Sequence, residues 1–497
     1  MKTSVGSVTS GASATSASRT QSHRCHLFHK CRRSGFKPSF FWLLAALVAV
    51  ALVASACSSD DDASPTTTAA QPSDTTETLT TTGQTSTTAS IASENTGSSA
   101  TDNLATGSSA PDASAPGTSA PDASVPGTSA PASLAPGNLE YPDPLPDAPP
   151  GTLIDVEPLG EFNGSVSAYR ILYHSRNRKD ENIAVSGYVL APLGDNTDWP
   201  VVAYAHGTTG MADECAPSAT VDSDLGGFGS EASLLAQVAA FGYVVVATDY
   251  EGLGTPGLHP YLVGESEARS ILDSVRAVQR MELAGDEFAV IGISQGGHAA
   301  LHAGQYWQTY APELDLVGVV SMAPPSQAAF IYDAIINTSS RGFIYMALGA
   351  YDVSYDEIDA SEVLTPKGVE LLAELENGCT DYVFDVFNGY EVSELISVDN
   401  PLAVPGWREI AIDNDVNQRA LPAPLFIAHG SADTLIPPAS SSLLCAQITP
   451  IPNQGPTLRR VYEGASHAGV AIAAATDITT WLAARFAGDE ATETGCG

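Results

Sequence analysis

The sequence predicts an α/β fold with a mostly parallel central sheet, helices on both faces and an inserted, mainly helical cap. Short apolar runs without polar alternation recur from residue 199 onward, and such runs are typical of strands buried on both faces of a parallel sheet. Helical stretches such as 267–281 separate most of them, as expected for an α/β fold. The predicted buried strands are 199–207, 243–249, 288–293, 316–323, 423–430 and 458–464, and an antiparallel pair is expected at 168–175 and 183–193.

Residues 1–56 are typical of an export signal. They contain seven Lys or Arg residues and no acidic residue, and they end in an uncharged apolar run over 40–56. The run closes with Ala-Ser-Ala before Cys57, which fits ordinary signal peptidase and also resembles a bacterial lipobox. An uncleaved membrane anchor is the alternative, although the run is slightly shorter than the span of about 20 residues that a bilayer needs.

The cysteine count favours a lipid-modified Cys57. Five of the seven cysteines remain after removal of the signal, and exported proteins tend to pair their cysteines. Four lie in the folded part, so Cys57 is left over as the site of a membrane anchor. A free or intermolecular thiol is the alternative.

Residues 57–140 consist mainly of Ser, Thr, Ala, Pro, Gly and Asp, and ten-residue repeats begin at Ser109, Ser119 and Ser129. This composition cannot bury enough apolar surface to offset the entropy of ordering, so we expect a disordered, extended tether. Residues 141–497 have the size of one catalytic domain.

The chain after the signal is strongly acidic. Seven of the 21 basic residues precede Cys57, whereas all 57 acidic residues follow it, which leaves a formal net charge of −43. A polyanion would be repelled, so nucleic acid is excluded as a partner.

The segment Gly292–Gly296 fits the pattern Gly-x-Ser-x-Gly, with Ser294 between a buried strand and a helical stretch. That is the setting of a nucleophile elbow, in which the serine occupies a strained turn and small residues allow strand and helix to approach closely. The backbone N–H of Gln295 would then face a developing oxyanion.

A serine nucleophile needs a base and an orienting carboxylate. Asp433 directly follows the predicted strand 423–430, and His467 follows the last one, so both are expected at the carboxyl edge of the sheet with Ser294. Asp413 and Asp415 are alternative acids, but only a short apolar run precedes them.

Four other histidines have simpler interpretations. His298 and His302 are four residues apart on one helix but lack a carboxylate or cysteine at ligand spacing, which favours packing over a metal site. His206 and His429 stand in His-Gly pairs at strand ends and are expected to shape loops. Nothing in the sequence implies a metal or an organic cofactor.

A second oxyanion donor is expected after an early strand. The loop "AHGTTG" nominates Thr208, and "TDYEGLG" nominates Asp249.

Residues 169–496 resemble the secretory lipase family of the lipase A type, within the α/β-hydrolases. The resemblance rests on "CAPS", "TDYEGLG", "GESEARSILDSVRA", "GISQGGHAA", "APELDLVG", "NGCTDYV", "HGSADTLIP" and the closing "CG". It implies an α/β-hydrolase fold, a triad of Ser294, Asp433 and His467, and oxyanion roles for Asp249 and Gln295. It also implies the disulfides Cys215–Cys379 and Cys445–Cys496. The loop "HGTTG" departs from the family and looks more like that of other esterases, which keeps Thr208 open.

About 100 residues separate the strands 316–323 and 423–430, far more than the dozen that a crossover needs. We expect the excess, about 326–421, to form a cap with an apolar substrate pocket. Its aromatic residues include Phe343 and Tyr345, of which at least one should face the pocket.

These observations predict an exported serine ester hydrolase, a triacylglycerol lipase or carboxylesterase, that acts on a small-molecule or lipid ester through an acyl-enzyme. An acyltransferase or peptidase with the same triad is one alternative. A non-catalytic surface binding protein on a hydrolase scaffold is the other, although such a protein need not keep all three triad residues.

Overall fold

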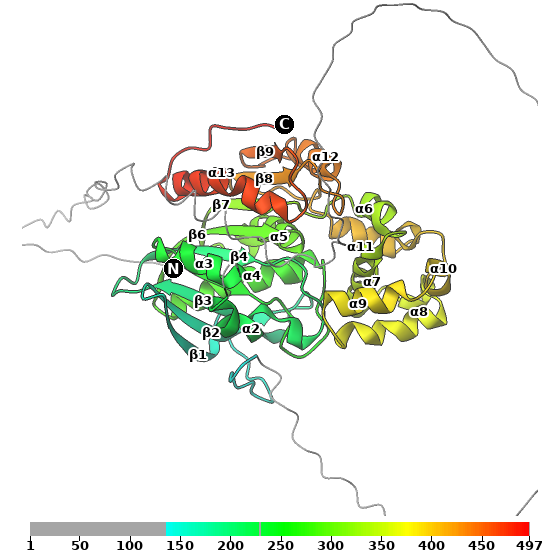
Figure 1. The fold of residues 1–497 in the computed structure, drawn as a ribbon, viewed down its shortest axis with the longest axis horizontal. Helices are drawn as coiled ribbons and strands as arrows, with labels where there is room; N and C mark the ends of the chain where they lie inside the picture. The colour runs from blue at the N-terminus through cyan, green and yellow to red at the C-terminus, as the bar shows by residue number, and fades with distance from the viewer. Residues whose placement is uncertain (1–135, 228–229, 497) are drawn as a thin grey trace, which may run out of the picture. The chain divides into compact units, whose positions relative to one another are not determined.

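The computed structural model describes residues 136–227 and 230–496 (Figure 1). Within them, one 9-stranded sheet has the order β1-β2-β3-β5-β4-β6-β7-β8-β9. The strands are β1 (Leu153–Phe162), β2 (Val166–Arg176), β3 (Asn182–Pro192), β4 (Trp199–Ala205), β5 (Val244–Thr248), β6 (Ala284–Ile293), β7 (Asp315–Met322), β8 (Leu425–Gly430) and β9 (Thr457–Tyr462).

The sheet has a parallel part and an antiparallel edge. Strands β4 to β9 pair in parallel, while β1, β2 and β3 form an antiparallel meander that joins β5 through β3. Every residue of β5 is buried, as expected for a strand covered on both faces. The sequence did not predict β1, because its polar and partly exposed residues leave no continuous apolar run.

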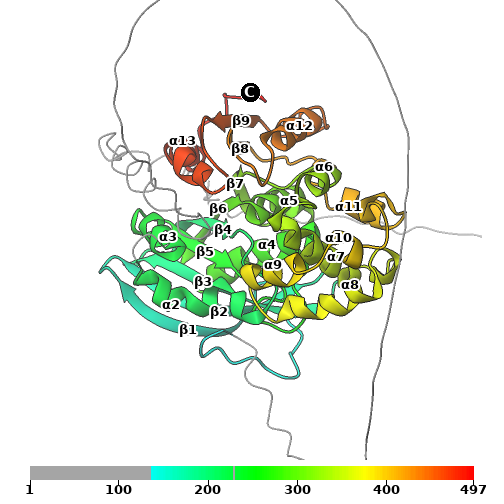
Figure 2. The same ribbon diagram turned by 45° about the vertical axis from the view of Figure 1, so that its right-hand side comes forward.

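Helices cover both faces of the sheet (Figures 1 and 2). One face packs against α4 (Gly264–Arg280), α5 (Gln295–Tyr310) and α12 (Pro438–Ile448). The other packs against α2 (Pro217–Leu225), α3 (Glu231–Ala240) and α13 (Gly469–Phe486). The structure is therefore an α/β-hydrolase fold, as the sequence predicts.

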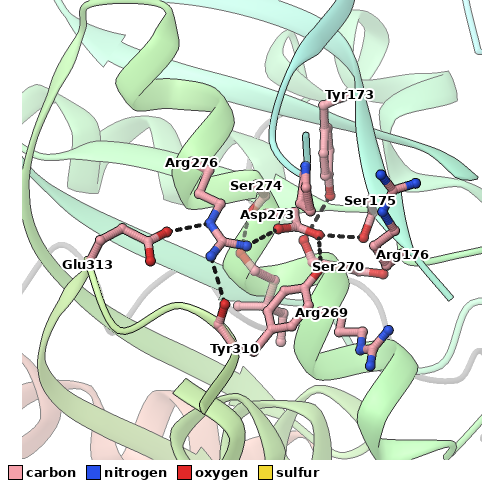
Figure 3. A network of polar contacts seen from close by, with 12 residues as sticks. Tyr173, Ser175, Arg176, Arg269, Ser270, Asp273, Ser274, Arg276, Tyr310 and Glu313 are labelled. Carbon is pink, nitrogen blue, oxygen red and sulfur yellow. Dashed lines mark hydrogen bonds and ion pairs between the residues drawn. The ribbon is translucent and has the colours of Figure 1, made fainter. Parts of the chain in front are cut away.

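A buried carboxylate, Asp273, joins α4 to its neighbours (Figure 3). It accepts hydrogen bonds from Ser175 of β2 at 2.6 Å and from Tyr310 of α5 at 2.8 Å, and it pairs with Arg276 at 2.7 Å. Burial raises the pKa of Asp273 to about 6, although these partners oppose the shift. The network fixes α4 against the sheet on the side that carries the elbow helix α5.

A run of helices connects β7 to β8 and forms the cap, gathered on one side of the core in both views (Figures 1 and 2). Tyr345, Phe387 and Trp407 are fully buried in its own apolar core, which also includes Tyr261 and Val263 from the loop after β5. The cap helices are α6 (Ala328–Ile335), α7 (Gly342–Ser354), α8 (Pro366–Leu371), α9 (Thr380–Asn388), α10 (Val392–Leu395) and α11 (Trp407–Asp413).

Two disulfides are present, with the pairing that the resemblance implies. Cys215–Cys379 links the loop after β4 to the start of α9, and Cys445–Cys496 links α12 to the C-terminal segment.

The predicted export signal, Cys57 and most of the tether lie outside the described residues. Among the residues that the structure describes, no helix is both long and apolar enough to cross a membrane.

Candidate active site

Ser294 occupies a strained turn between β6 and α5. Its backbone angles, φ 56° and ψ −123°, lie in a region that residues other than glycine rarely adopt. A Cβ atom on Gly292 would lie 2.0 Å from the Gly296 carbonyl oxygen, and one on Gly296 would lie 1.9 Å from that of Ala205. The two glycines of the motif are therefore required by close backbone approach, as in a nucleophile elbow.

Asp433 and His467 meet at the same edge of the sheet. Asp433 follows β8, His467 follows β9, and Asp433 Oδ2 lies 2.7 Å from His467 Nδ1. The carboxylate can only accept, so the ring proton is on Nδ1 and Nε2 is left as a potential proton acceptor.

The Asp433 carboxylate is held by four groups. Its Oδ1 accepts hydrogen bonds from the backbone N–H groups of Leu435 and Ile436, at 3.0 and 2.9 Å. Its Oδ2 contacts His467 and, at 3.2 Å, Nε2 of His429. Burial alone would raise the pKa of Asp433, but these donors outweigh it and hold the pKa well below the usual range. Asp433 is therefore ionised at neutral pH.

No hydrogen bond joins Ser294 to His467 among the described residues. The Nε2 atom of His467 is buried and has no hydrogen-bond partner, and Ser294 is half-buried. Catalytic hydrogen bonds are often long before substrate binds, so this geometry does not conflict with a proton transfer between the two.

The loop after β4 lies against the elbow. A Cβ atom on Gly207 would be 3.8 Å from Cβ of Ser294, and the neighbouring Thr208 hydroxyl lies 2.9 Å from the hydroxyl of Tyr261. The same loop is fixed to the cap, because Thr209 O accepts a hydrogen bond from Thr380 N at 3.0 Å, beside the Cys215–Cys379 disulfide.

Asp249 does not suit an oxyanion role. Its backbone N–H donates to Ser186 O at 2.9 Å, and its buried carboxylate accepts hydrogen bonds from Ser186 and Ser218. Burial raises the pKa of Asp249 to about 6, against the effect of these hydrogen bonds. The backbone N–H of Asp249 is therefore engaged, and Thr208 stays the candidate for the second oxyanion donor.

Sequence reasoning missed a buried network behind Gln295. The side-chain amide of Gln295 donates to Glu267 at 3.1 Å and to Nε2 of His259 at 2.8 Å. Glu267 also accepts a 2.6 Å hydrogen bond from Nδ1 of His298, whose Nε2 donates to Asn414 O at 2.8 Å. Glu267 lies in the predicted helical stretch 267–281 and in the segment "GESEARSILDSVRA", but no local pattern singled it out as a functional residue.

The network contains two histidines whose pKa values shift in opposite directions. Burial alone would lower the pKa of His298, but the Glu267 charge and both hydrogen bonds raise it overall. Burial lowers the pKa of His259 to about 4, so its Nε2 accepts a hydrogen bond from the Gln295 amide while Nδ1–H donates to Glu251 O. The His298–Glu267 pair thus fixes the residue that follows Ser294.

An apolar pocket that is partly open to solvent extends from Ser294 to the cap. Phe343 lines it, whereas Tyr345 is buried and stacks on Phe387 with ring centroids 4.3 Å apart. The remaining lining is largely aliphatic, with Ile331, Ile335, Ile344, Leu348, Leu402 and Leu435 among its members. Such a pocket suits a hydrocarbon chain.

The remaining candidate metal ligand, His302, and the alternative acids Asp413 and Asp415 make contacts typical of structural residues. His302 Nε2 donates to Asn414 O at 3.1 Å, and the described residues contain no group of three side chains that could hold a metal ion. Asp413 is exposed and pairs with Arg419, while Asp415 accepts hydrogen bonds from backbone N–H groups at the start of α6.

Comparisons with known proteins agree with this architecture. A family model described as secretory lipase matches residues 223–494. A secreted triacylglycerol lipase of Malassezia globosa is 26% identical over 364 residues, which are 69% of this chain and 75% of the relative. A probable inactive lipase of Mycobacterium tuberculosis is 24% identical over 365 residues, or 70% of this chain and 80% of the relative.

A crystal structure of Candida antarctica lipase A in its closed state has the same fold. Its TM-score is 0.60 at 20% identity, over 70% of this chain and 85% of that one. The family model covers more than half of the sequence, and the predicted resemblance is confirmed: the chain belongs to the secretory lipase family.

Proposed function

We propose that this chain is an exported hydrolase of carboxylic esters with Ser294 as nucleophile, His467 as base and Asp433 as the orienting acid. One observation carries the proposal. A serine in a strained strand-to-helix turn lines an apolar pocket, at the sheet edge where an ionised aspartate holds a histidine with its second nitrogen unpaired. Family membership supports ester hydrolysis as the reaction class.

In this proposal each step is assigned to one named group. Nε2 of His467 takes the Ser294 proton, and Oγ attacks the ester carbonyl. The N–H groups of Gln295 and Thr208 stabilise the oxyanion, and Asp433 stabilises the imidazolium. His467 then protonates the leaving alcohol, and water releases the acid from the acyl-enzyme by the same route.

The substrate class follows from the pocket. Its lining is mostly aliphatic and aromatic, so we infer that it takes an acyl chain of a lipid or small-molecule ester. The relatives named as secreted triacylglycerol lipases support this class.

The decisive experiment is labelling with a fluorophosphonate probe, followed by peptide mapping. We expect a single adduct on Ser294, and Ser294→Ala should lower nitrophenyl ester hydrolysis on the order of 10³-fold or more without unfolding. Asp433→Asn should also be severely impaired, whereas Asp413→Asn, an exposed carboxylate, serves as the matched control. An unlabelled, folded wild type would favour a non-catalytic protein, the alternative that the probable inactive relative makes relevant.

We also propose that the mature chain begins at a lipid-modified Cys57, and that residues 57–140 form a tether between this anchor and the catalytic domain. The left-over cysteine and the Pro- and Ser-rich composition support this arrangement.

A further inference from the structure

The apolar pocket contains two polar atoms without partners. Asp415 is 9% exposed and Ser326 is 3% exposed, and both line the pocket that also contains Ser294. Asp415 Oδ1 and Ser326 Oγ are buried and have no hydrogen-bond partner. Buried polar atoms are rarely left unpaired, because an unmet hydrogen bond destabilises the fold, so an unpaired pair on a pocket wall needs an explanation.

The Asp415 carboxylate is held in one orientation. Its Oδ2 accepts hydrogen bonds from the backbone N–H groups of Gln327 at 2.8 Å and Ala328 at 3.2 Å. Gln327 has a left-handed φ of 62° and directly follows Ser326. The same contact therefore fixes both the free oxygen of Asp415 and the turn that presents the Ser326 hydroxyl.

Neighbouring polar groups do not supply hydrogen-bond partners for Asp415 Oδ1 and Ser326 Oγ. Asn414 uses its side-chain oxygen on Gly264 N and its amide on Tyr355 and Ile410, and both nitrogens of His298 are engaged. Burial raises the pKa of Asp415, and the backbone N–H of Asn417 is among the groups that oppose this shift, but it makes no hydrogen bond of standard geometry with Oδ1. The free atoms of Asp415 and Ser326 are thus available to a ligand.

We propose that Asp415 and Ser326 form a polar subsite that binds a hydroxyl group of the ester substrate. A carboxylate oxygen only accepts, whereas a serine hydroxyl both donates and accepts, so a substrate hydroxyl can bond to each. A substrate cation fits less well, because His298, which donates a hydrogen bond from each ring nitrogen, lines the same pocket. The inference rests on the proposed ester hydrolysis and names its preferred substrates as hydroxylated esters.

The hydroxyl has two possible sources, the acyl chain or the alcohol, and matched ester pairs separate them. The acyl pair is 4-nitrophenyl 6-hydroxyhexanoate and 4-nitrophenyl hexanoate. The alcohol pair is 2,3-dihydroxypropyl butyrate and propyl butyrate. In at least one pair, wild-type kcat/KM should favour the hydroxylated ester about tenfold or more, because a site built for a hydroxyl discriminates against the analogue that lacks it.

Three variants test the assignment. Ser326→Ala removes one hydrogen-bond partner of the substrate hydroxyl. Asp415→Asn puts an amide N–H donor at the position of the free carboxylate oxygen. Each variant should bring the ratio of kcat/KM between the hydroxylated and the plain ester close to one. Asp413→Asn, two residues away and exposed, should keep both the preference and the rate. Thermal melting of each variant distinguishes loss of the subsite from loss of the fold. If Asp415→Asn does not fold, the ester preference of Ser326→Ala alone tests the inference.

Equal kcat/KM within both ester pairs would overturn the inference, and the pocket atoms would then be satisfied by water alone. A preference that survives in folded Ser326→Ala and Asp415→Asn would overturn it as well. Neither result touches the proposed function, which fails only if the wild type hydrolyses none of the four esters and Ser294 is not labelled.

Discussion

The buried pair of Glu267 and His298 offers the sharpest test of how the elbow is held in place. Glu267→Gln keeps the shape of the side chain but removes its charge, so His298 loses its partner while both remain fully enclosed. Gln295 loses a charged acceptor in the same step. The substitution should therefore affect both folding stability and the position of the residue after Ser294.

The magnitude follows from burial. Removing one partner of a buried ion pair leaves an uncompensated charge and costs about 3–5 kcal/mol of unfolding free energy. Glu265→Gln, on the same helix, removes a more exposed i,i+4 pair with Arg269 and should cost only about 0–1 kcal/mol. The double variant Glu267→Gln with His298→Gln should recover much of the loss, because no unpaired charge remains.

The loss of unfolding free energy in Glu267→Gln should depend on pH, and the pKa shift of His298 fixes the direction of that dependence. The folded-state pKa of His298 is raised above the ordinary value of 6.5. Its contribution to stability is therefore fully present below about pH 6.5 and is lost as the pH rises through the raised pKa. Urea denaturation of wild type and Glu267→Gln between pH 5 and pH 9 should show a difference that shrinks toward high pH.

Kinetics separate a positioning role from a purely structural one. If Glu267 positions the Gln295 N–H, Glu267→Gln should lower kcat with little change in KM, since that donor acts mainly on the transition state. Loss of one oxyanion donor costs about 10²–10³ in kcat, which sets the upper limit. A Glu267→Gln protein as stable and as active as Glu265→Gln would refute the reasoning.

Three further predictions concern the pocket, a disulfide and the anchor. Phe343→Ala should change the chain-length preference among nitrophenyl esters, whereas Tyr345→Ala should instead cost about 3–5 kcal/mol of stability with an unaltered profile; the opposite pattern would place the pocket elsewhere. Replacing Cys215 and Cys379 together by serine should destabilise the fold by up to about 5 kcal/mol, given their separation of 164 residues, and should lower kcat because the Thr208 loop loosens; calorimetry and initial rates measure the two effects. Cys57→Ala should release the mature protein from the membrane fraction, and continued membrane association would favour an uncleaved apolar anchor.

Much of the architecture could be predicted because local sequence patterns indicate the buried strands and the turn at Ser294. The strands β5 and β8 are buried along their whole length, so each appears as a continuous apolar run. The turn at Ser294 could be located because only glycine allows the close approach at positions 292 and 296. The loops of Asp433 and His467 follow recognisable strands, and parallel strands bring their carboxyl ends to one edge.

The acidic charge follows from the sequence alone. The export signal, the tether and the unpaired Cys57 stay predictions from composition, because most of these residues lie outside the part of the chain that the structure describes. The edge strand β1 escaped prediction because a strand with polar, half-exposed residues lacks the apolar signal of its neighbours.

Only the tertiary structure decided which groups are free to act. Asp249 and Thr208 both follow buried strands, and only the structure shows that Ser186 of a neighbouring strand occupies the backbone N–H of Asp249. Phe343 and Tyr345 are two residues apart on one helix, and their roles differ because Phe387, more than 40 positions later, covers Tyr345. Hydrogen-bond availability and pocket exposure depend on contacts between segments that are distant in the chain, and no local pattern encodes those contacts.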